Sequence, residues 1–112
     1  MKREELEAAG VDVEDGLGRV LGNEQLYERL LGIFAQDTSY DELARAMERG
    51  DDDAARAAAH TLKGAAANLS MKTLAELAMG VLTALRAGDR AEAERLMPAL
   101  ADARDAVLRA IG

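Results

Sequence analysis

No cysteine occurs among the 112 residues of the chain. Disulfide bonds, thiolate nucleophiles and cysteine-ligated metal sites are therefore excluded. The absence agrees with a reducing compartment, and we expect the protein in the cytoplasm.

Long apolar runs are also missing. No stretch approaches the roughly 18 apolar residues of a membrane-spanning helix. The first ten residues, MKREELEAAG, lack the apolar centre of a signal peptide. We therefore expect a soluble domain that does not enter a membrane.

Positive charge is in short supply. The chain has 14 basic and 21 acidic residues, which leaves a formal net charge of −7. A net acidic domain gains little from meeting a phosphate backbone. We therefore expect no nucleic acid partner, whereas a partner with a basic or apolar docking face is easier to accommodate.

Residues that favour strands are scarce. The chain has two tyrosines, one phenylalanine and no tryptophan, and alanine and leucine, both strong helix formers, predominate. Apolar residues make up 49% of the chain, so it can bury a modest core. The composition predicts an all-α fold, and the length fits one domain over residues 1–112.

Glycine and polar capping residues divide the chain into segments with helical periodicity. Asn23 and the acidic run from Asp51 are typical of helix starts, and Gly50 and Gly88 of helix ends. Short connections between amphipathic helices favour antiparallel neighbours, and hence a bundle. The predicted helices span 2–9, 13–21, 24–37, 39–49, 51–68, 71–87 and 90–111. We expect residues 1–10 to form a short accessory helix or to be disordered.

Two of these helices carry more specific expectations. In the segment that begins at residue 24, Leu26, Leu30, Ile33 and Phe34 recur with helical period and form one apolar stripe. Pro98 lies inside the last segment, where it lacks a backbone N–H and clashes with the preceding turn. We expect it to kink or split that helix.

The only histidine of the chain, His60, lies within the predicted helix 51–68. The larger apolar residues of this helix, Leu62 and Leu69, share a face with alanines. His60 precedes Leu62 by two positions, which is about 200° around a helix. If Leu62 faces the core, His60 faces solvent.

The helical neighbours of His60 include three very small residues. Ala57, Gly64 and Ala67 leave the imidazole uncovered, so another protein surface can approach it closely. Gly64 costs about 1 kcal/mol relative to alanine in a helix interior. Its presence indicates that even a methyl group would obstruct something near His60.

Two cations lie within one turn of the histidine. Arg56 and Lys63 can each stabilise an anionic phosphoryl group on the ring. Imidazole can present an unprotonated nitrogen as a nucleophile at physiological pH, and a phosphoryl group on it is labile. Because the chain has no nucleotide-binding glycine loop, it is equipped to receive and pass on a phosphoryl group and not to take one from ATP.

Each of these residues also has a plainer interpretation. A lone surface histidine on a helix usually has no function, and Lys63 and Arg56 alone are most often solvated side chains. Gly64 alone could mark a close contact between helices. The conjunction of these residues favours a phosphocarrier, and the geometry by itself leaves the plainer interpretations open.

The motif AHTLKG at residues 59–64, followed by AAANL at 65–69, resembles the histidine-containing phosphotransfer (HPt) domain family. The similarity extends to apolar and glycine positions between 11 and 34 and between 74 and 89. It therefore covers nearly the whole chain.

The resemblance implies an antiparallel four-helix bundle with one or two short accessory helices and an exposed histidine midway along one helix. It implies that His60 accepts a phosphoryl group from an aspartate of a response-regulator receiver domain, alone or within a hybrid histidine kinase, and returns it to another receiver. It implies no kinase or ATPase activity. We expect no cofactor or metal on this chain, since the magnesium belongs to the receiver, and we expect a monomer.

The resemblance also assigns the residues around the histidine. Lys63 and Gly64 match positions that assist the phosphoryl group and keep access open. To these we add Arg56 as a second assisting cation. The residues expected to give access or to dock a partner are Ala57, Gly64, Ala67 and Asn68.

Two departures from the family pattern carry expectations of their own. Ser70 replaces a common glycine, and we expect it to change the turn and to cap the next helix. Leu82 replaces a common glutamate, with Gly80 two positions before it. We expect Leu82 to enlarge an apolar surface for a partner or a second copy.

Three other functions compete with the phosphocarrier. A non-catalytic adaptor would bind a receiver or another protein without carrying phosphate. A metal-binding bundle is disfavoured, because the Glu-x-x-His arrangement is absent and the chain has one histidine and no cysteine. We do not expect a histidine kinase dimerisation domain, because such a domain is followed by an ATP-binding domain and the helix count favours a single-chain bundle over a dimeric hairpin.

Overall fold

The computed structural model describes all residues, 1–112, and its regular structure is helical, with one isolated bridge between Val11 and Met71. The all-α prediction is confirmed. The helices are α1 (Arg3–Ala8), α2 (Val13–Arg19), α3 (Glu24–Phe34), α4 (Ser39–Arg49), α5 (Asp52–Asn68), α6 (Lys72–Arg86) and α7 (Arg90–Ile111).

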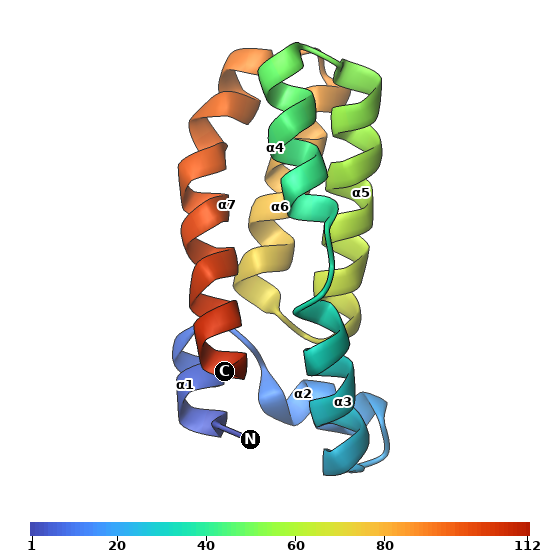
Figure 1. The fold of residues 1–112 in the computed structure, drawn as a ribbon, viewed down its shortest axis with the longest axis vertical. Helices are drawn as coiled ribbons and strands as arrows, with labels where there is room; N and C mark the ends of the chain where they lie inside the picture. The colour runs from blue at the N-terminus through green and yellow to red at the C-terminus, as the bar shows by residue number, and fades with distance from the viewer.

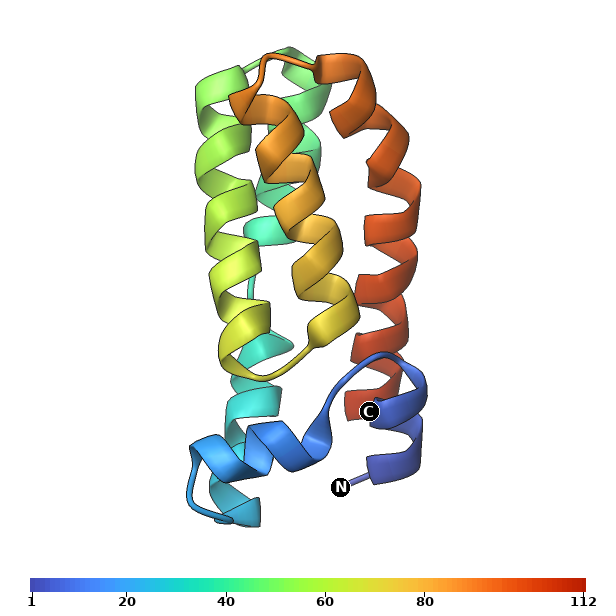
Figure 2. The same cartoon turned by 180° about the vertical axis from the view of Figure 1, so that it is seen from behind.

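The helices α4, α5, α6 and α7 lie lengthwise beside one another (Figures 1 and 2). Short connections join them at alternating ends, so the helices form a bundle, and the whole chain measures 41 × 20 × 20 Å. α3 lies below α4 in Figure 1, and α1 and α2 lie at the same end, near both termini. Three helices therefore precede the lengthwise set, where the sequence predicts one or two accessory helices.

Asn23 and Asp51, which are typical of helix starts, begin α3 and α5, and Asp89 begins α7 in the same way. The side chains of Asn23, Asp51 and Asp89 each accept a hydrogen bond from a backbone N–H three residues further on, at 3.0–3.1 Å. These bonds satisfy N–H groups that have no partner within the helix. At the other ends, Gly50 and Gly88 follow α4 and α6 with positive φ angles of 72° and 73°.

The predicted bounds of α4 and α7 agree with the structure at both ends, and the largest error lies at the end of α3. This helix ends at Phe34, three residues before the predicted end. Asp37 instead accepts a hydrogen bond from the backbone N–H of Ser39 at 2.8 Å, which turns the chain into α4.

Pro98 does not split α7, contrary to one of the two expected outcomes. The helix is continuous from Arg90 to Ile111 with the proline inside it. Pro98 removes the hydrogen bond to the carbonyl of Glu94, and both residues are exposed. Water can therefore satisfy that carbonyl, which lets the helix continue.

The buried face of α3 differs from the predicted stripe. Tyr27, Leu31 and Phe34 face the core, whereas Ile33 is 60% exposed and Leu30 is only half-buried. Most of the stripe that the periodicity picks out therefore lies outside the core. The rotation of α3 depends on Tyr27, an anchor that the aliphatic pattern did not include.

Tyr27 fixes α3 against the turn between α5 and α6. Its hydroxyl donates a hydrogen bond to the carbonyl of Leu69 at 2.7 Å. A Cβ atom at Gly16 would lie 2.5 Å from the tyrosine ring, so the glycine makes room for it. Burial raises the pKa of Tyr27 to about 12, and the hydroxyl therefore keeps its proton and remains a donor.

The expectation for Leu82 is wrong. Its side chain is 1% exposed and belongs to the core, so it adds nothing to an apolar surface. Leu82 shares the inner face of α6 with Ala78, Val81 and Leu85. Gly80 has a packing role, because a Cβ atom there would approach Leu96 of α7 to 3.2 Å.

The expectation for Ser70 is also wrong. Ser70 adopts the left-handed conformation that glycine favours, with φ 59°, and its side chain does not cap α6. The hydroxyl instead donates to Asp15 of α2 at 2.5 Å, and the carbonyl accepts the backbone N–H of Asp12 at 2.8 Å. These bonds to α2 offset the cost of the strained backbone and join the α5–α6 turn to the N-terminal helices.

Asp15 of α2 accepts hydrogen bonds from three side chains where α2 meets the α5–α6 turn. The hydrogen bond from Ser70, followed by those from Arg19 and Lys72, lowers the pKa of the carboxyl below its usual value of 3.8 despite partial desolvation. A lowered folded pKa means that the carboxylate contributes stability above the unfolded pKa. That contribution is lost as the pH falls through the folded pKa.

Two substitutions at Ser70 separate its hydrogen bond from its backbone strain. Ser70→Ala removes the bond and keeps the left-handed backbone, so we expect it to lower the free energy of unfolding by about 1–2 kcal/mol. Ser70→Gly also removes the bond but relieves the strain, so we expect it to be about 1 kcal/mol less damaging. Urea unfolding of the three proteins measures both effects, and equal stability of the two variants would contradict the strain at this position.

Candidate functional site around His60

The buried face of α5 determines the orientation of the histidine. Leu62 is 1% exposed and packs in the core with four alanines of the same helix. His60 is exposed, as its position about 200° from Leu62 predicts. The imidazole therefore lies on the outer face of α5, eight residues from the start of the helix and eight from its end.

The two flanks of the histidine differ in chemistry. At about 100° per residue, Ala57 and Gly64 lie on one side of His60, and Arg56 and Lys63 lie on the other. Ala57 lines a groove with residues of α4, so the small residues occupy the flank that faces α4. The outer face of α5 is therefore open on one side of the imidazole and cationic on the other.

Of the two cations, Lys63 is the one without a carboxylate partner. Arg56 forms an ion pair and hydrogen bond with Asp53, three positions earlier on the same helix. Lys63 is half-buried and makes no ion pair. An exposed pair is weak, yet Asp53 offsets the charge of Arg56, so Lys63 is the better placed of the two to attract an anion.

Gly64 is not a site of close helix packing. A Cβ atom built there meets no atom within 4 Å, so nothing inside the molecule requires a glycine. The other expected access residues are also uncovered: Ala57 and Asn68 are exposed, and Ala67 is half-exposed. These four residues form a shallow strip beside the imidazole.

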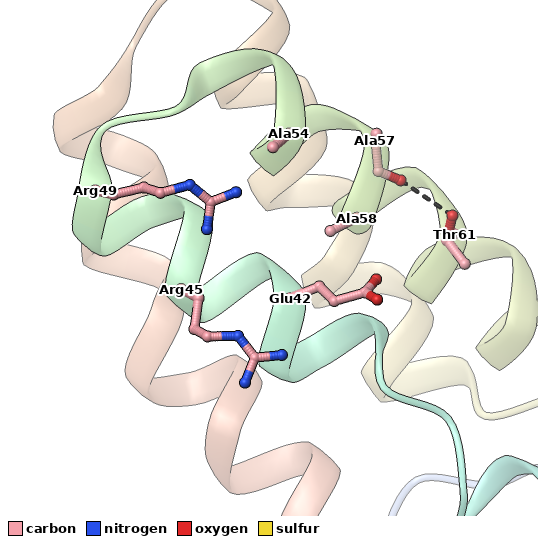
Figure 3. Close-up of a pocket in the computed structure, with 7 residues that line it drawn as sticks. All are labelled: Glu42, Arg45, Arg49, Ala54, Ala57, Ala58 and Thr61. Carbon is pink, nitrogen blue, oxygen red and sulfur yellow. Dashed lines mark hydrogen bonds between the residues drawn. The ribbon is translucent and has the colours of Figure 1, made fainter.

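A groove between α4 and α5 borders this strip (Figure 3). Its volume is about 460 Å³. We call it the arginine groove, because Arg45 and Arg49 of α4 are among its lining residues, together with alanines of α5 (Figure 3). Its lining residues are Glu42, Arg45, Arg49, Ala54, Ala57, Ala58 and Thr61.

A second groove, of about 590 Å³, lies between α3 and the C-terminal half of α5. We call it the apolar groove, since Leu30, Ile33 and Phe34 form its α3 side. Asn68 belongs to its other side together with Ala65 and Leu69. The half-buried Leu30 and the exposed Ile33 of the predicted stripe therefore line a groove beside the histidine helix.

Sequence reasoning missed both grooves. The sequence pattern does indicate that Glu42, Arg45 and Arg49 share one flank of α4, because they are three and four positions apart. Their meeting with the alanine face of α5 depends on how the two helices pack, which no local pattern contains. The structure brings Ala57 and Asn68 to the edges of the two grooves, one to each.

Two further structural facts bear on the alternatives. No three carboxylate or imidazole side chains lie close enough together to hold a metal ion. None of the helices combines the length and the apolar character that crossing a bilayer requires.

The family model described as Hpt domain matches residues 29–110, which includes the whole of α4, α5 and α6 and nearly all of α7. The chain belongs to the Hpt domain family. No curated protein and no solved structure matches the chain significantly. The resemblance that the motif at 59–69 indicates is confirmed.

Membership of the Hpt family implies a phosphotransfer-type role in two-component signalling, with receiver domains and histidine kinases as interaction partners. Hpt domains are phosphocarriers and generally not enzymes. His60, Lys63 and Gly64 all fall within the matched residues, as do both grooves.

Gly64→Ala tests whether the glycine has any internal structural purpose. Because the added methyl group meets no atom and alanine is the better helix former, we expect the free energy of unfolding to rise by about 0.5–1 kcal/mol. Chemical denaturation of both proteins measures the change. A loss of stability would mean that Gly64 is required by the fold and not by what approaches His60.

Proposed function

We propose that this Hpt domain is a phosphorelay intermediate in which His60 accepts a phosphoryl group from a receiver-domain aspartate and passes it to another receiver. The observation that carries the proposal is the exposure of the only histidine in mid-helix, beside a strip where even a methyl group would have free space at Gly64. Because the aspartate of a receiver is buried, it can reach only a nucleophile that projects from the surface of the partner's helix.

The chemistry requires one unprotonated ring nitrogen. Its lone pair attacks phosphorus of the acyl phosphate, the P–O bond to the aspartate breaks, and the aspartate leaves as a carboxylate. A P–N bond forms on His60, and the reverse steps return the phosphoryl group to a second aspartate. Magnesium at the receiver's acidic site would stabilise the charge on the transferring oxygens from the partner's side.

The cationic flank supplies the contribution of this chain to charge stabilisation. Lys63, which has no carboxylate partner, is proposed to interact with the phosphoryl oxygens, because a charge-assisted hydrogen bond is stronger than a neutral one. Arg56 is proposed to assist after it leaves Asp53, a weak exposed pair. The residues proposed to give the partner access are Ala57, Gly64, Ala67 and Asn68.

The proposal includes the organisation of the protein. We take α4–α7 as the antiparallel four-helix bundle of the family, with residues 1–112 as one domain. We further propose a monomer that works in the cytoplasm and needs no cofactor of its own.

A non-catalytic adaptor is the second candidate, and the apolar groove favours it. Ile33 is 60% exposed and lines that groove together with Leu30 and Phe34, and a contiguous apolar patch is typical of an interaction surface. Docking over this groove would bind a receiver whether or not His60 reacts. The two functions therefore differ only in the fate of the phosphoryl group.

Phosphoryl transfer from a panel of phosphorylated receiver domains distinguishes the two candidates. We expect radiolabel to appear on the wild type and not on His60→Gln, because glutamine has no nucleophilic nitrogen. The label on the wild type should be labile in acid and stable in base, as expected of a phosphorylated imidazole. Label on both proteins would show that His60 is not the acceptor.

Two controls complete this experiment. Gly64→Leu should retain the helix content of the wild type, measured by circular dichroism, and lose most of the transfer, because its side chain would fill the open strip. Receiver binding should survive in His60→Gln, since the docking surface is unchanged. If receivers bind the wild type but none of them transfers label to it, the result would favour the adaptor.

A further inference from the structure

We propose that the arginine groove receives a carboxylate of the docked receiver and thereby fixes the orientation in which the partner lies across His60. This inference rests on the proposed phosphorelay function and adds Arg45 and Arg49 as residues that determine partner specificity. The net charge of −7 favours partners with a basic face, whereas this contact requires an acidic group on the partner.

The groove lies next to His60 along α5. Ala57 and Thr61 line the groove, and they lie three positions before and one position after the histidine on α5. The open strip leads from the imidazole over Ala57 directly into the groove. A partner that uses this strip therefore also meets the side chains of α4.

The charges in the groove are available for binding. Arg45 is exposed and has no carboxylate within 4.0 Å, whereas Arg49 has only an exposed neighbour, Asp51, at 3.5 Å. Glu42 at the other end accepts a hydrogen bond from Thr38 and is the one acidic side chain that lines the groove. Arg45 can therefore form a new charge-assisted bond without giving up an existing ion pair.

The apolar groove explains why a contact between the arginine groove and a partner carboxylate would fix the orientation of the partner. It borders the same flank of α5, but at the other end of the strip. Ala57 in one groove and Asn68 in the other are eleven positions apart, which corresponds to about 16 Å along the helix. A partner must then present an apolar group at one end and a carboxylate at the other, and a reversed partner would place the carboxylate against Ile33 and Phe34.

The features of the groove favour a protein carboxylate over a free anion. Both guanidinium groups are on exposed side chains, and no buried polar side chain lines the groove. A small ion would gain only solvent-screened attraction there. A carboxylate on a docked protein is held in place by the rest of the interface and excludes water from the arginines, which strengthens the interaction.

Charge reversal at Arg45 tests the proposal. The initial rate of transfer to His60 is measured at low and high salt, using the receiver that labels the wild type fastest. We expect Arg45→Glu to lower the low-salt rate at least tenfold through a higher KM, and Arg45→Ala to lower it less. Arg86→Glu is the matched control, because Arg86 is also exposed and without an ion pair but lies outside both grooves, and its rate should stay within about twofold of wild type.

A small phosphoryl donor separates docking from the chemistry at His60. Phosphoramidate needs no docking surface, so it should label the wild type and all three variants equally. Equal labelling together with unchanged receiver transfer in Arg45→Glu would overturn the role of the groove and leave the phosphorelay function intact. Failure of both donors to label the wild type would instead overturn the phosphorelay function.

Two other occupants of the groove give distinct results. If millimolar inorganic phosphate slows transfer to the wild type at constant ionic strength but not to Arg45→Glu, the groove binds a free anion and the proposal is wrong. If the wild type sediments as a dimer and Arg45→Glu as a monomer, the groove binds a second copy of the chain, which also contradicts it.

Discussion

The burial of Leu62 in the core is the contact on which the site depends. Because α5 is a regular helix, fixing Leu62 inward fixes His60 outward, and the same rotation sends Ala57 and Gly64 to one flank and Lys63 to the other. The alanines that share the face of Leu62 let α4 and α6 pack closely against this helix. The exposed face that carries His60 is thus a consequence of how the core packs.

The two flanks of the outer face that results differ in chemistry. One flank of His60 carries Lys63, a cation with no partner inside the molecule. The other flank is an open strip that leads into the arginine groove and the apolar groove. In the proposed function, charge stabilisation and partner docking are therefore separated around the helix, so a docked protein need not displace the lysine to reach the imidazole.

Local patterns predicted a large part of this arrangement. Caps at Asn23 and Asp51 and the exposure of His60 follow from short-range hydrogen bonding and helical period, and both were predicted correctly. The pairing of Arg56 with Asp53 is equally local and could have been foreseen. The burial of Leu82, the rotation of α3 about Tyr27 and the left-handed Ser70 depend on contacts between distant segments, as do the two grooves, and no local pattern contained them.

The central claim is that His60 holds a phosphoryl group that a receiver can remove, and return transfer tests it most directly. The protein is labelled with phosphoramidate, freed of donor, and mixed with an unphosphorylated receiver that labels the wild type in the forward direction. The account predicts that label leaves His60 and appears on the receiver far faster than it is lost to water. Label that stays on the protein until it hydrolyses, at the same rate with and without receiver, would contradict the account.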